Sequence, residues 1–267
     1  MKTLDYSIII PAYNEAKRIS PTLRHIAAFI QERSWDAEVL VVNDGSTDET
    51  AAVVERFADE FSIVRLIQLP RNLGKGNAIS VGVDQSRGDQ ILFADADDST
   101  PIADSEKLFD ALRAGADVAM GSRWVDPAVQ IQPQPWYRLL NGRLYSFLVR
   151  AVLGVKFKDT QNGFKAYSSR AAKSIFPLQR ISGWGFDAEV IFLAQRFGFK
   201  VVEIPVKYTY YSEGSKIRPY RDGARMLWEL LKVRYGGWTG AYPKTPDHLN
   251  ERPVVSSGAA ACKDSDA

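Results

Sequence analysis

The first half of the chain alternates short apolar runs with segments of helical spacing, and this alternation restricts the possible folds more than any other feature. The runs that predict strands are 6–12, 37–43, 62–69, 89–95 and 116–122. Segments with helical spacing separate them at 21–33, 48–61, 77–85 and 105–114. Strands this apolar, joined by helices, indicate a mostly parallel sheet with helices on both faces. The sequence therefore predicts an α/β fold.

The second half is less regular. Helices are predicted at 136–153, 183–196 and 222–234, and a further strand at 200–208. From residue 241 the sequence is rich in Pro, Ser, Ala and charged residues and has no apolar periodicity. Such a composition cannot bury enough apolar surface to order a chain. Residues 241–267 are therefore predicted to be a disordered tail.

Composition excludes several classes of function. The formal net charge of +2 gives no reason to expect a nucleic-acid partner. Cys262 is the only cysteine, and His25 and His248 are far apart, so a zinc site of the Cys/His kind is not expected. The chain shows no signal peptide and no apolar run of about 18 residues that would span a membrane. The protein is expected to be cytoplasmic.

The polar residues of the first half gather where the predicted strands end. The loops 11–15, 43–47, 70–77 and 94–101 hold most of the unusual polar side chains. In open parallel sheets, ligands bind beyond the carboxyl ends of the strands. The loops are therefore expected to form one composite site.

Two carboxylates follow the apolar run "ILFA" in the stretch "ILFADADDST". Asp95 and Asp97 are spaced i, i+2, so in an extended segment they project to the same side. That arrangement suits a hard cation such as Mg²⁺ or Mn²⁺, together with phosphate oxygens and water. The alternative is an acidic turn exposed to solvent.

The stretch "NLGKGNA" (72–78) places two glycines around Lys75 at the predicted start of a helix. Backbone N–H groups, a lysine and a helix N-terminus together suit a pyrophosphate. The stretch is neither a complete dinucleotide fingerprint, because Ile79 replaces the third glycine, nor a Walker A loop. A flexible turn with a solvated lysine is the alternative.

The order of these motifs resembles family 2 glycosyltransferases, which are inverting enzymes with the Rossmann-like GT-A fold. The motifs are "SIIIPAYNEAKRI", "VVNDGSTDET", "RNLGKGNAI" and "ADADDST". In the second half, "GSRW", "DTQNGFKAY" and "WGFDAEV" resemble the dolichyl-phosphate and polyprenyl-phosphate hexose synthases, above all the dolichyl-phosphate β-glucosyltransferases. The resemblance implies one domain over residues 1–240, with a nucleotide-sugar half (1–122) and an acceptor half (123–240).

The resemblance also implies roles for single residues. Asp95 and Asp97 match the carboxylates that bind Mg²⁺ or Mn²⁺ at the donor's phosphates. Arg123 aligns with a residue that holds donor or acceptor phosphate, and Arg138 aligns more loosely with an acceptor-phosphate residue, for which Arg143 competes. An arginine at 138 that only covers apolar surface is the alternative. The residues implied in donor binding are Pro11, Tyr13, Glu15, Asp44, Lys75, Asp95 and Arg123.

Three carboxylates of the second half are candidates for the reaction itself, together with Arg123. Asp159 opens a loop that lies near the reacting sugar in the family, where a carboxylate can act as general base. An acceptor phosphate is mostly dianionic at pH 7 and scarcely needs a base, so Asp159 can instead orient the acceptor. Asp187 and Glu189 begin a predicted helix two residues apart and do not share a face. One is expected to reach the sugar or the acceptor while the other caps the helix.

The expected activity is inverting transfer of a hexose, glucose above others, from a UDP-sugar to a polyprenyl or dolichyl phosphate. The product would be β-linked. The amphipathic helices 136–153 and 222–234 fit either a membrane surface or the core, and a lipid acceptor favours the membrane for the first. The protein is then peripheral on the cytoplasmic face of a membrane. The alternatives are GDP-mannose as donor, a soluble or glycan acceptor, a binding protein without turnover, and a dehydrogenase.

Overall fold

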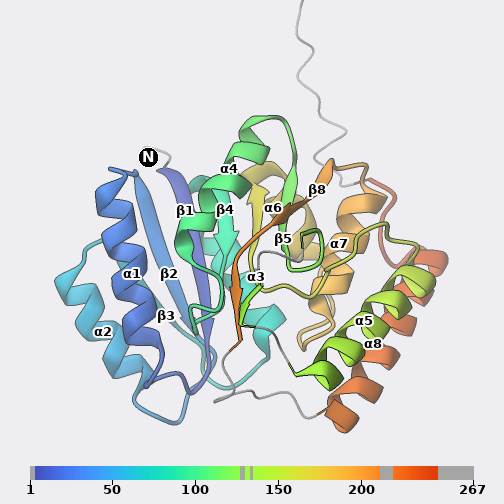
Figure 1. The fold of residues 1–267 in the computed structure, drawn as a ribbon, viewed down its shortest axis with the longest axis horizontal. Coiled ribbons are helices and arrows are strands. Elements are labelled where there is room, and N and C mark those ends of the chain that lie inside the picture. Colours follow the sequence, from blue (N-terminus) through green and yellow to red (C-terminus); the bar gives the residue numbers. More distant parts are fainter. Residues whose placement is uncertain (1–3, 127–129, 133–134, 211–218, 246–267) are drawn as a thin grey trace, which may run out of the picture.

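A seven-stranded sheet runs through the molecule and carries helices on both faces (Figure 1). The computed structural model describes residues 4–126, 130–132, 135–210 and 219–245. The strand order is β3-β2-β1-β4-β7-β5-β8, and only β7 runs antiparallel to its neighbours. The strands are β1 Leu4–Ala12, β2 Ala37–Asn43, β3 Val64–Gln68, β4 Gly88–Phe93, β5 Val118–Ser122, β7 Lys165–Ser168 and β8 Val201–Pro205. The predicted α/β fold with a mostly parallel sheet is therefore confirmed.

Successive residues of the central strands enter two separate cores, as the twofold repeat of a strand requires. In β1, Ile8 and Ile10 face one core and Ile9 faces the other. The first core is covered by α1 (Ile19–Glu32), α2 (Thr50–Glu60) and α4 (Ser105–Arg113). The second is covered by α3 (Lys75–Gln85), α6 (Ser169–Ile175) and α7 (Phe186–Arg196). Short 3-10 helices, η1 (Ile102–Asp104) and η3 (Phe176–Leu178), precede α4 and follow α6.

Strand β7 joins the two halves of the chain. It lies between β4 and β5, with Tyr167 opposite Ile91 and Lys165 opposite Met120. The sequence pattern did not predict β7 or α6, because the strand has only the residues "KAYS", one of them a buried lysine. Residues 1–122 and 123–240 therefore share one sheet.

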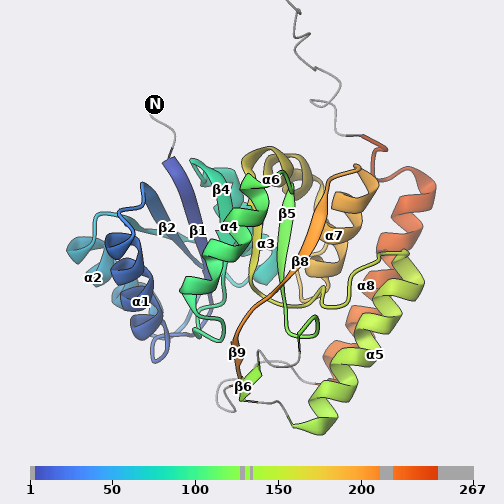
Figure 2. The same ribbon diagram turned by 45° about the horizontal axis from the view of Figure 1, so that its top comes forward.

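Two long helices, α5 (Trp136–Leu153) and α8 (Pro219–Thr239), lie side by side at one end of the sheet (Figures 1 and 2). Their inner faces join the core through Val149 and Leu153 of α5 and Leu230 and Val233 of α8. None of the helices in the described ranges is long and apolar enough to cross a bilayer. A second, two-stranded sheet of β6 (Gln130–Gln132) and β9 (Tyr208–Thr209) lies near the start of α5 (Figure 2).

The segment after α8 differs from the prediction of a disordered tail from residue 241. Tyr242 is only 2% exposed, and its hydroxyl donates to Glu189 at 2.5 Å. Arg180 donates to the carbonyl of Ala241, and Arg196 to the carbonyl of Pro243. The aromatic ring of Tyr242 thus fastens residues 241–243 to the fold. Residues 246–267 of the predicted tail lie outside the described part of the chain.

Candidate active site

A pocket of about 1520 Å³ lies beyond the carboxyl ends of the parallel strands. All four polar loops contribute to its wall, as expected for one composite site. The residues proposed from sequence that line it are Pro11, Tyr13, Glu15, Asp44, Lys75, Asp95, Asp97, Arg123 and Asp187. Asp159, Glu189 and Arg143 are not among the lining residues. Arg138 lies on α5, but its side chain is outside the described part of the structure.

Asp44 fixes the glycine-containing loop at one end of the pocket. Its carboxylate accepts hydrogen bonds from the backbone N–H groups of Leu73 at 2.7 Å and Gly74 at 2.8 Å. Gly74 has φ +102°, and a Cβ there would overlap the carbonyl oxygen of Ser182. The N–H of Gly76 donates to that same oxygen at 2.8 Å. The glycines thus let the loop pack closely on the chain around 182, and these N–H groups are not available to a pyrophosphate as the sequence suggested.

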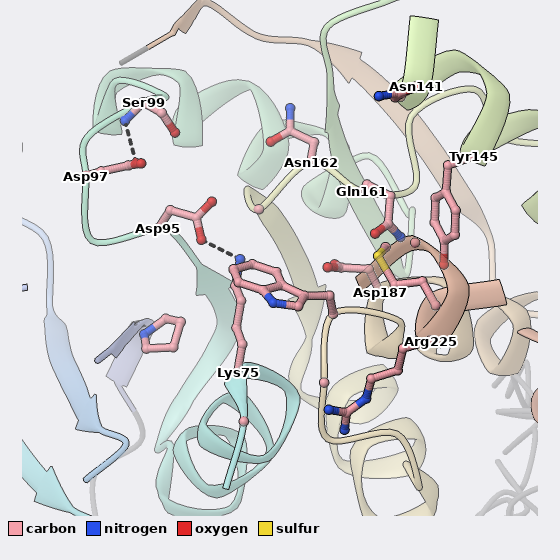
Figure 3. Close-up of a pocket in the computed structure, with 18 of the residues that line it drawn as sticks. Lys75, Asp95, Asp97, Ser99, Asn141, Tyr145, Gln161, Asn162, Asp187 and Arg225 are labelled. Atoms are coloured by element: carbon pink, nitrogen blue, oxygen red, sulfur yellow. Dashed lines mark hydrogen bonds and ion pairs between the residues drawn. The ribbon is translucent and has the colours of Figure 1, made fainter. Parts of the chain in front are cut away.

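The side chain of Lys75 is therefore what this loop presents to the pocket. Its Nζ points toward the carboxylate of Asp95 (Figure 3). The distance from Nζ to Oδ1 of Asp95 is 2.5 Å, and Nζ is 5.5 Å from the centre of the Trp184 ring. Burial lowers the pKa of Lys75, but the charges of Asp95 and Asp187 outweigh this effect and raise the pKa above its usual value. The lysine is a buried cation between two carboxylates.

Asp95 and Asp97 both line the pocket, at the end of β4. Asp97 accepts a hydrogen bond from the N–H of Ser99 at 3.1 Å, and an Arg18 nitrogen is 3.8 Å from its Oδ2. Burial and the nearby charge of Asp95 raise the pKa of Asp97. No group of three or more His, Cys, Asp or Glu side chains suited to a metal occurs among the described residues. Two carboxylates fit a Mg²⁺ or Mn²⁺ ion that takes its other ligands from phosphate oxygens and water.

Glu15, on the loop that follows β1, already has hydrogen-bond partners. Its carboxylate forms two hydrogen bonds of 2.8 Å with the guanidinium of Arg18, and its N–H donates to Oγ1 of Thr50. Glu15 and Arg18 both line the pocket. The pair presents a fixed, hydrogen-bonded surface at this end of the site.

Asp159 does not line the pocket, and its carboxylate is bound to Arg123. Its carboxylate accepts from the backbone N–H of Arg123 at 2.9 Å and from the guanidinium at 2.8 and 2.7 Å. Its own N–H donates to Glu203 at 2.8 Å, and its side chain is fully buried. Asp159 therefore holds Arg123, which itself lines the pocket.

Asp187 and Glu189 face different ways, as their spacing predicted. Asp187 lines the pocket and forms a buried ion pair with Lys165. Burial raises the pKa of Asp187 and lowers that of Lys165. Glu189 instead accepts from the N–H groups of Arg180 at 2.9 Å and Ile181 at 2.8 Å, and from Tyr242. Glu189 does not line the pocket, and these contacts connect α7 to residues 180–181 and to Tyr242.

Several lining residues were not singled out from sequence. The hydroxyl of Tyr145 and the amide nitrogens of Gln161 and Asn162 are buried polar atoms with no hydrogen-bond partner in the described structure. Gln161 and Asn162 belong to the quoted motif "DTQNGFK", so their position was a usable signal. Glu229 of α8 is 6% exposed and accepts from the N–H of Gly185 at 3.1 Å. Helical periodicity alone did not show that this carboxylate faces inward.

The far end of the pocket is apolar and continues onto the outside of the molecule. Trp136, Leu140 and Leu144 of α5 and Leu227 of α8 line the pocket and are also exposed, Trp136 by 75%. We refer to these and the other exposed large apolar side chains of α5 and α8 as the α5–α8 apolar surface. It consists of Trp136, Leu140, Leu144, Phe147, Leu227, Trp228, Leu231, Tyr235 and Trp238.

Comparison with known proteins agrees with the fold and the motifs. The model of Glycosyl transferase family 2 matches residues 7–176. Dolichyl-phosphate beta-glucosyltransferase of Homo sapiens is 34% identical to this chain over 253 residues, which cover 90% of this chain and 78% of that protein. The protein of the same name from Drosophila melanogaster is 33% identical, with 88% and 77% covered.

Solved structures share the architecture at lower identity. Mannosyl-3-phosphoglycerate synthase from Rubrobacter xylanophilus superposes with a TM-score of 0.66 at 17% identity, over 90% of this chain and 76% of that one. Glucosyl-3-phosphoglycerate synthase from Mycobacterium tuberculosis, in complex with Mn²⁺, UDP and glucosyl-3-phosphoglycerate, gives 0.63 at 19% identity, over 89% and 80%. These likenesses establish the GT-A fold. By its sequence motifs, its family match and its relatives, the chain belongs to glycosyl transferase family 2 and is a glycosyltransferase related to the dolichyl-phosphate β-glucosyltransferases.

Proposed function

We propose that this enzyme transfers a glucosyl group from UDP-glucose to a polyprenyl phosphate of the dolichyl type, at a membrane surface. The observation that carries the proposal is the form of the pocket. Its charged end holds Lys75, Asp95 and Asp97, and its other end opens onto the α5–α8 apolar surface. A nucleotide-sugar and a lipid phosphate would therefore meet between the two ends.

The charged end fits a nucleoside diphosphate. Asp95 and Asp97 would hold Mg²⁺ or Mn²⁺, whose positive charge would stabilise the departing diphosphate. Lys75 would contact a phosphate oxygen, and Pro11, Tyr13 and Asp44 would line the nucleoside site. The hexose would lie between Asp95 and α5, where Tyr145, Gln161 and Asn162 offer polar groups to its hydroxyls.

The hydrogen bonds and ion pairs of the three candidate carboxylates favour a phosphate acceptor over an alcohol. Asp159 is bound to Arg123, Asp187 to Lys165, and Glu189 to backbone N–H groups. A general base must be able to receive a proton from its substrate, and each of these groups already has cationic or N–H partners. A phosphate monoester with a second pKa of about 6 brings its own anionic oxygen at pH 7. That oxygen would attack the anomeric carbon in line with the departing UDP, and the configuration would invert.

The apolar surface supports a lipid acceptor and contact with a membrane. It contains aromatic and aliphatic side chains on neighbouring helices, with Trp228 exposed by 59% and Trp238 by 72%. Amphipathic helices of this kind bury their apolar face in the interfacial region of a bilayer. The sequence favoured this role for α5 only, whereas α8 exposes a similar face. The cytoplasmic side remains a prediction from sequence.

The proposal is tested with purified protein, a divalent cation, and a panel of UDP-glucose, UDP-galactose and GDP-mannose. Each donor is offered dolichyl phosphate in detergent and, separately, 3-phosphoglycerate or a soluble sugar alcohol. We expect a β-linked glucosyl lipid phosphate, with the anomeric configuration read by NMR. Transfer from GDP-mannose, or efficient transfer to a soluble acceptor without lipid, would contradict the proposed donor or acceptor respectively.

Membrane contact has its own measurement, which is co-sedimentation with phospholipid vesicles. Replacing Trp228 or Trp238 by Ser should weaken binding by about tenfold or more for each side chain that the bilayer buries. Val125, exposed by 41% and outside α5 and α8, provides the control in Val125→Ser. Equal binding by all three variants would argue against this surface as the membrane contact.

A further inference from the structure

The metal site proposed above already has a cation at one of its two carboxylates. Lys75 Nζ is 2.5 Å from Asp95 Oδ1, and the lysine side chain is only 15% exposed (Figure 3). This is a charge-assisted hydrogen bond, about twice as strong as a neutral one. A divalent ion that binds Asp95 in this arrangement must compete with the ammonium group.

The protein supplies few ligands that would help a divalent ion to compete with Lys75 for Asp95. The described residues supply Asp95 and Asp97 but no third ligand of the carboxylate, histidine or cysteine kind nearby. A Mg²⁺ or Mn²⁺ ion takes six ligands, so most of its coordination shell must come from water or from the donor. Without a diphosphate, the ion would displace Lys75 and gain few protein contacts.

A diphosphate changes this balance because it offers the ammonium group another anion. Lys75 is the first residue of α3, and its long side chain can change rotamer. The Trp184 ring, 5.5 Å from Nζ, can stabilise the ammonium group by a cation–π interaction while it moves. When Lys75 moves to a phosphate oxygen, Asp95 becomes available to the metal. The same phosphate group then completes the metal's coordination.

We propose that Lys75 is a resident cation that occupies Asp95 until a nucleoside diphosphate draws it away, so that the divalent ion and the donor bind as a unit. This inference rests on the proposed function, because it takes the donor to be a nucleoside diphosphate sugar. By thermodynamic linkage, the factor by which UDP tightens metal binding equals the factor by which the metal tightens UDP binding. Lys75 contributes to that factor by weakening the binding of metal alone.

The test measures binding and needs no turnover. Free Mn²⁺ is followed by electron paramagnetic resonance during titration of the protein, first without nucleotide and then with saturating UDP. In Lys75→Met, Mn²⁺ alone should bind about ten- to a hundredfold more tightly than in the wild type, because a charge-assisted contact no longer competes. The enhancement of Mn²⁺ binding by UDP should shrink by a similar factor. Lys75→Arg keeps the cation and should behave like the wild type.

A matched control separates displacement from a general effect of charge. Arg18 also lines the pocket, but it is bonded to Glu15 and its nearest nitrogen is 3.8 Å from Asp97. Arg18→Met removes the same charge at a longer distance from the metal carboxylates, so Mn²⁺ binding should change by about threefold or less. Folding of each variant is checked by thermal unfolding, and Lys75→Gln replaces Lys75→Met if the latter does not fold.

The outcomes distinguish a failure of this inference from a failure of the proposed function on which it rests. Unchanged binding of Mn²⁺ alone in folded Lys75→Met, or an equal gain in Arg18→Met, would overturn the proposed role of Lys75 but would not contradict the proposed function. Wild-type protein that binds no Mn²⁺ even with UDP would overturn the metal site itself and, with it, both proposals.

Discussion

Gly163 allows Asp95 to occupy its position, and adding one methyl group there should disable the donor site. A Cβ at Gly163 would lie 2.6 Å from Cγ and 2.7 Å from Oδ1 of Asp95, whereas ordinary contacts begin at 3.4 Å. Oδ2 of Asp95 would lie closer still, so the carboxylate would have to move by about 1.3 Å in Gly163→Ala. Overpacking of this kind costs about 1–3 kcal/mol of unfolding free energy. A displacement near 1 Å at a reacting centre costs on the order of a hundredfold in rate.

The assay compares metal-dependent UDP binding, kcat/KM for transfer and unfolding in urea. Gly223→Ala is the control, because Gly223 lines the same pocket and a Cβ there meets nothing within 4 Å. The control should keep full activity and gain up to about 1 kcal/mol of stability, since alanine favours a helix more than glycine. If folded Gly163→Ala transferred sugar within about threefold of the wild type, the reasoning from the crowded carboxylate would be refuted.

Three further predictions concern buried carboxylates. Asp159→Asn should lower the free energy of unfolding by about 3–5 kcal/mol in denaturant titrations, because it removes the carboxylate charge that neutralises the buried Arg123. Lost activity with unchanged stability would instead mark Asp159 as a base. Glu229→Ala should cost about 1–3 kcal/mol by orphaning the N–H of Gly185, whereas Glu229→Gln should restore most of it; equal stability of both variants would contradict this contact. Burial raises the pKa of Asp44 above 3.8, so the contribution of Asp44 to the free energy of unfolding should fall as the pH rises from 3.8 through the raised pKa. Urea titrations at several pH values should show this fall in the wild type and not in Asp44→Asn.

The sequence predicted which loops of the first half line the pocket, because its signals there are local. Strands such as 37–43 are continuous apolar runs, and parallel strands must bring their carboxyl ends to one edge. That rule suffices to place Asp44, Lys75 and Asp95 around one pocket. Motif spacing did not show that the backbone N–H groups around Gly74 are hydrogen-bonded within the protein. The sequence therefore suggested that these groups would bind phosphate.

Contacts between distant segments explain the remaining differences. Asp159 and Arg123 are both charged residues in polar loops, and only the fold shows that they neutralise each other. Helical spacing alone does not show that Glu229 is buried, whereas in the fold its carboxylate accepts a hydrogen bond from the N–H of Gly185. Tyr242 lies in a stretch whose composition suggests disorder, yet its own buried ring packs into the fold and anchors residues 241–243. A local pattern does not reveal a partner that lies far away along the chain.

The position of β7 also affects how the chain can fold during synthesis. The strand inserts between β4 and β5, although about 70 residues separate it from β4 in sequence. Until residue 168 is available, β4 is an edge strand with unpaired backbone groups and apolar side chains on both faces. Such an edge invites pairing with other chains. Residues 1–122 are therefore not expected to fold independently, and a fragment that ends before β7 would be prone to aggregate even though it contains all the pocket-lining loops that follow the first four strands.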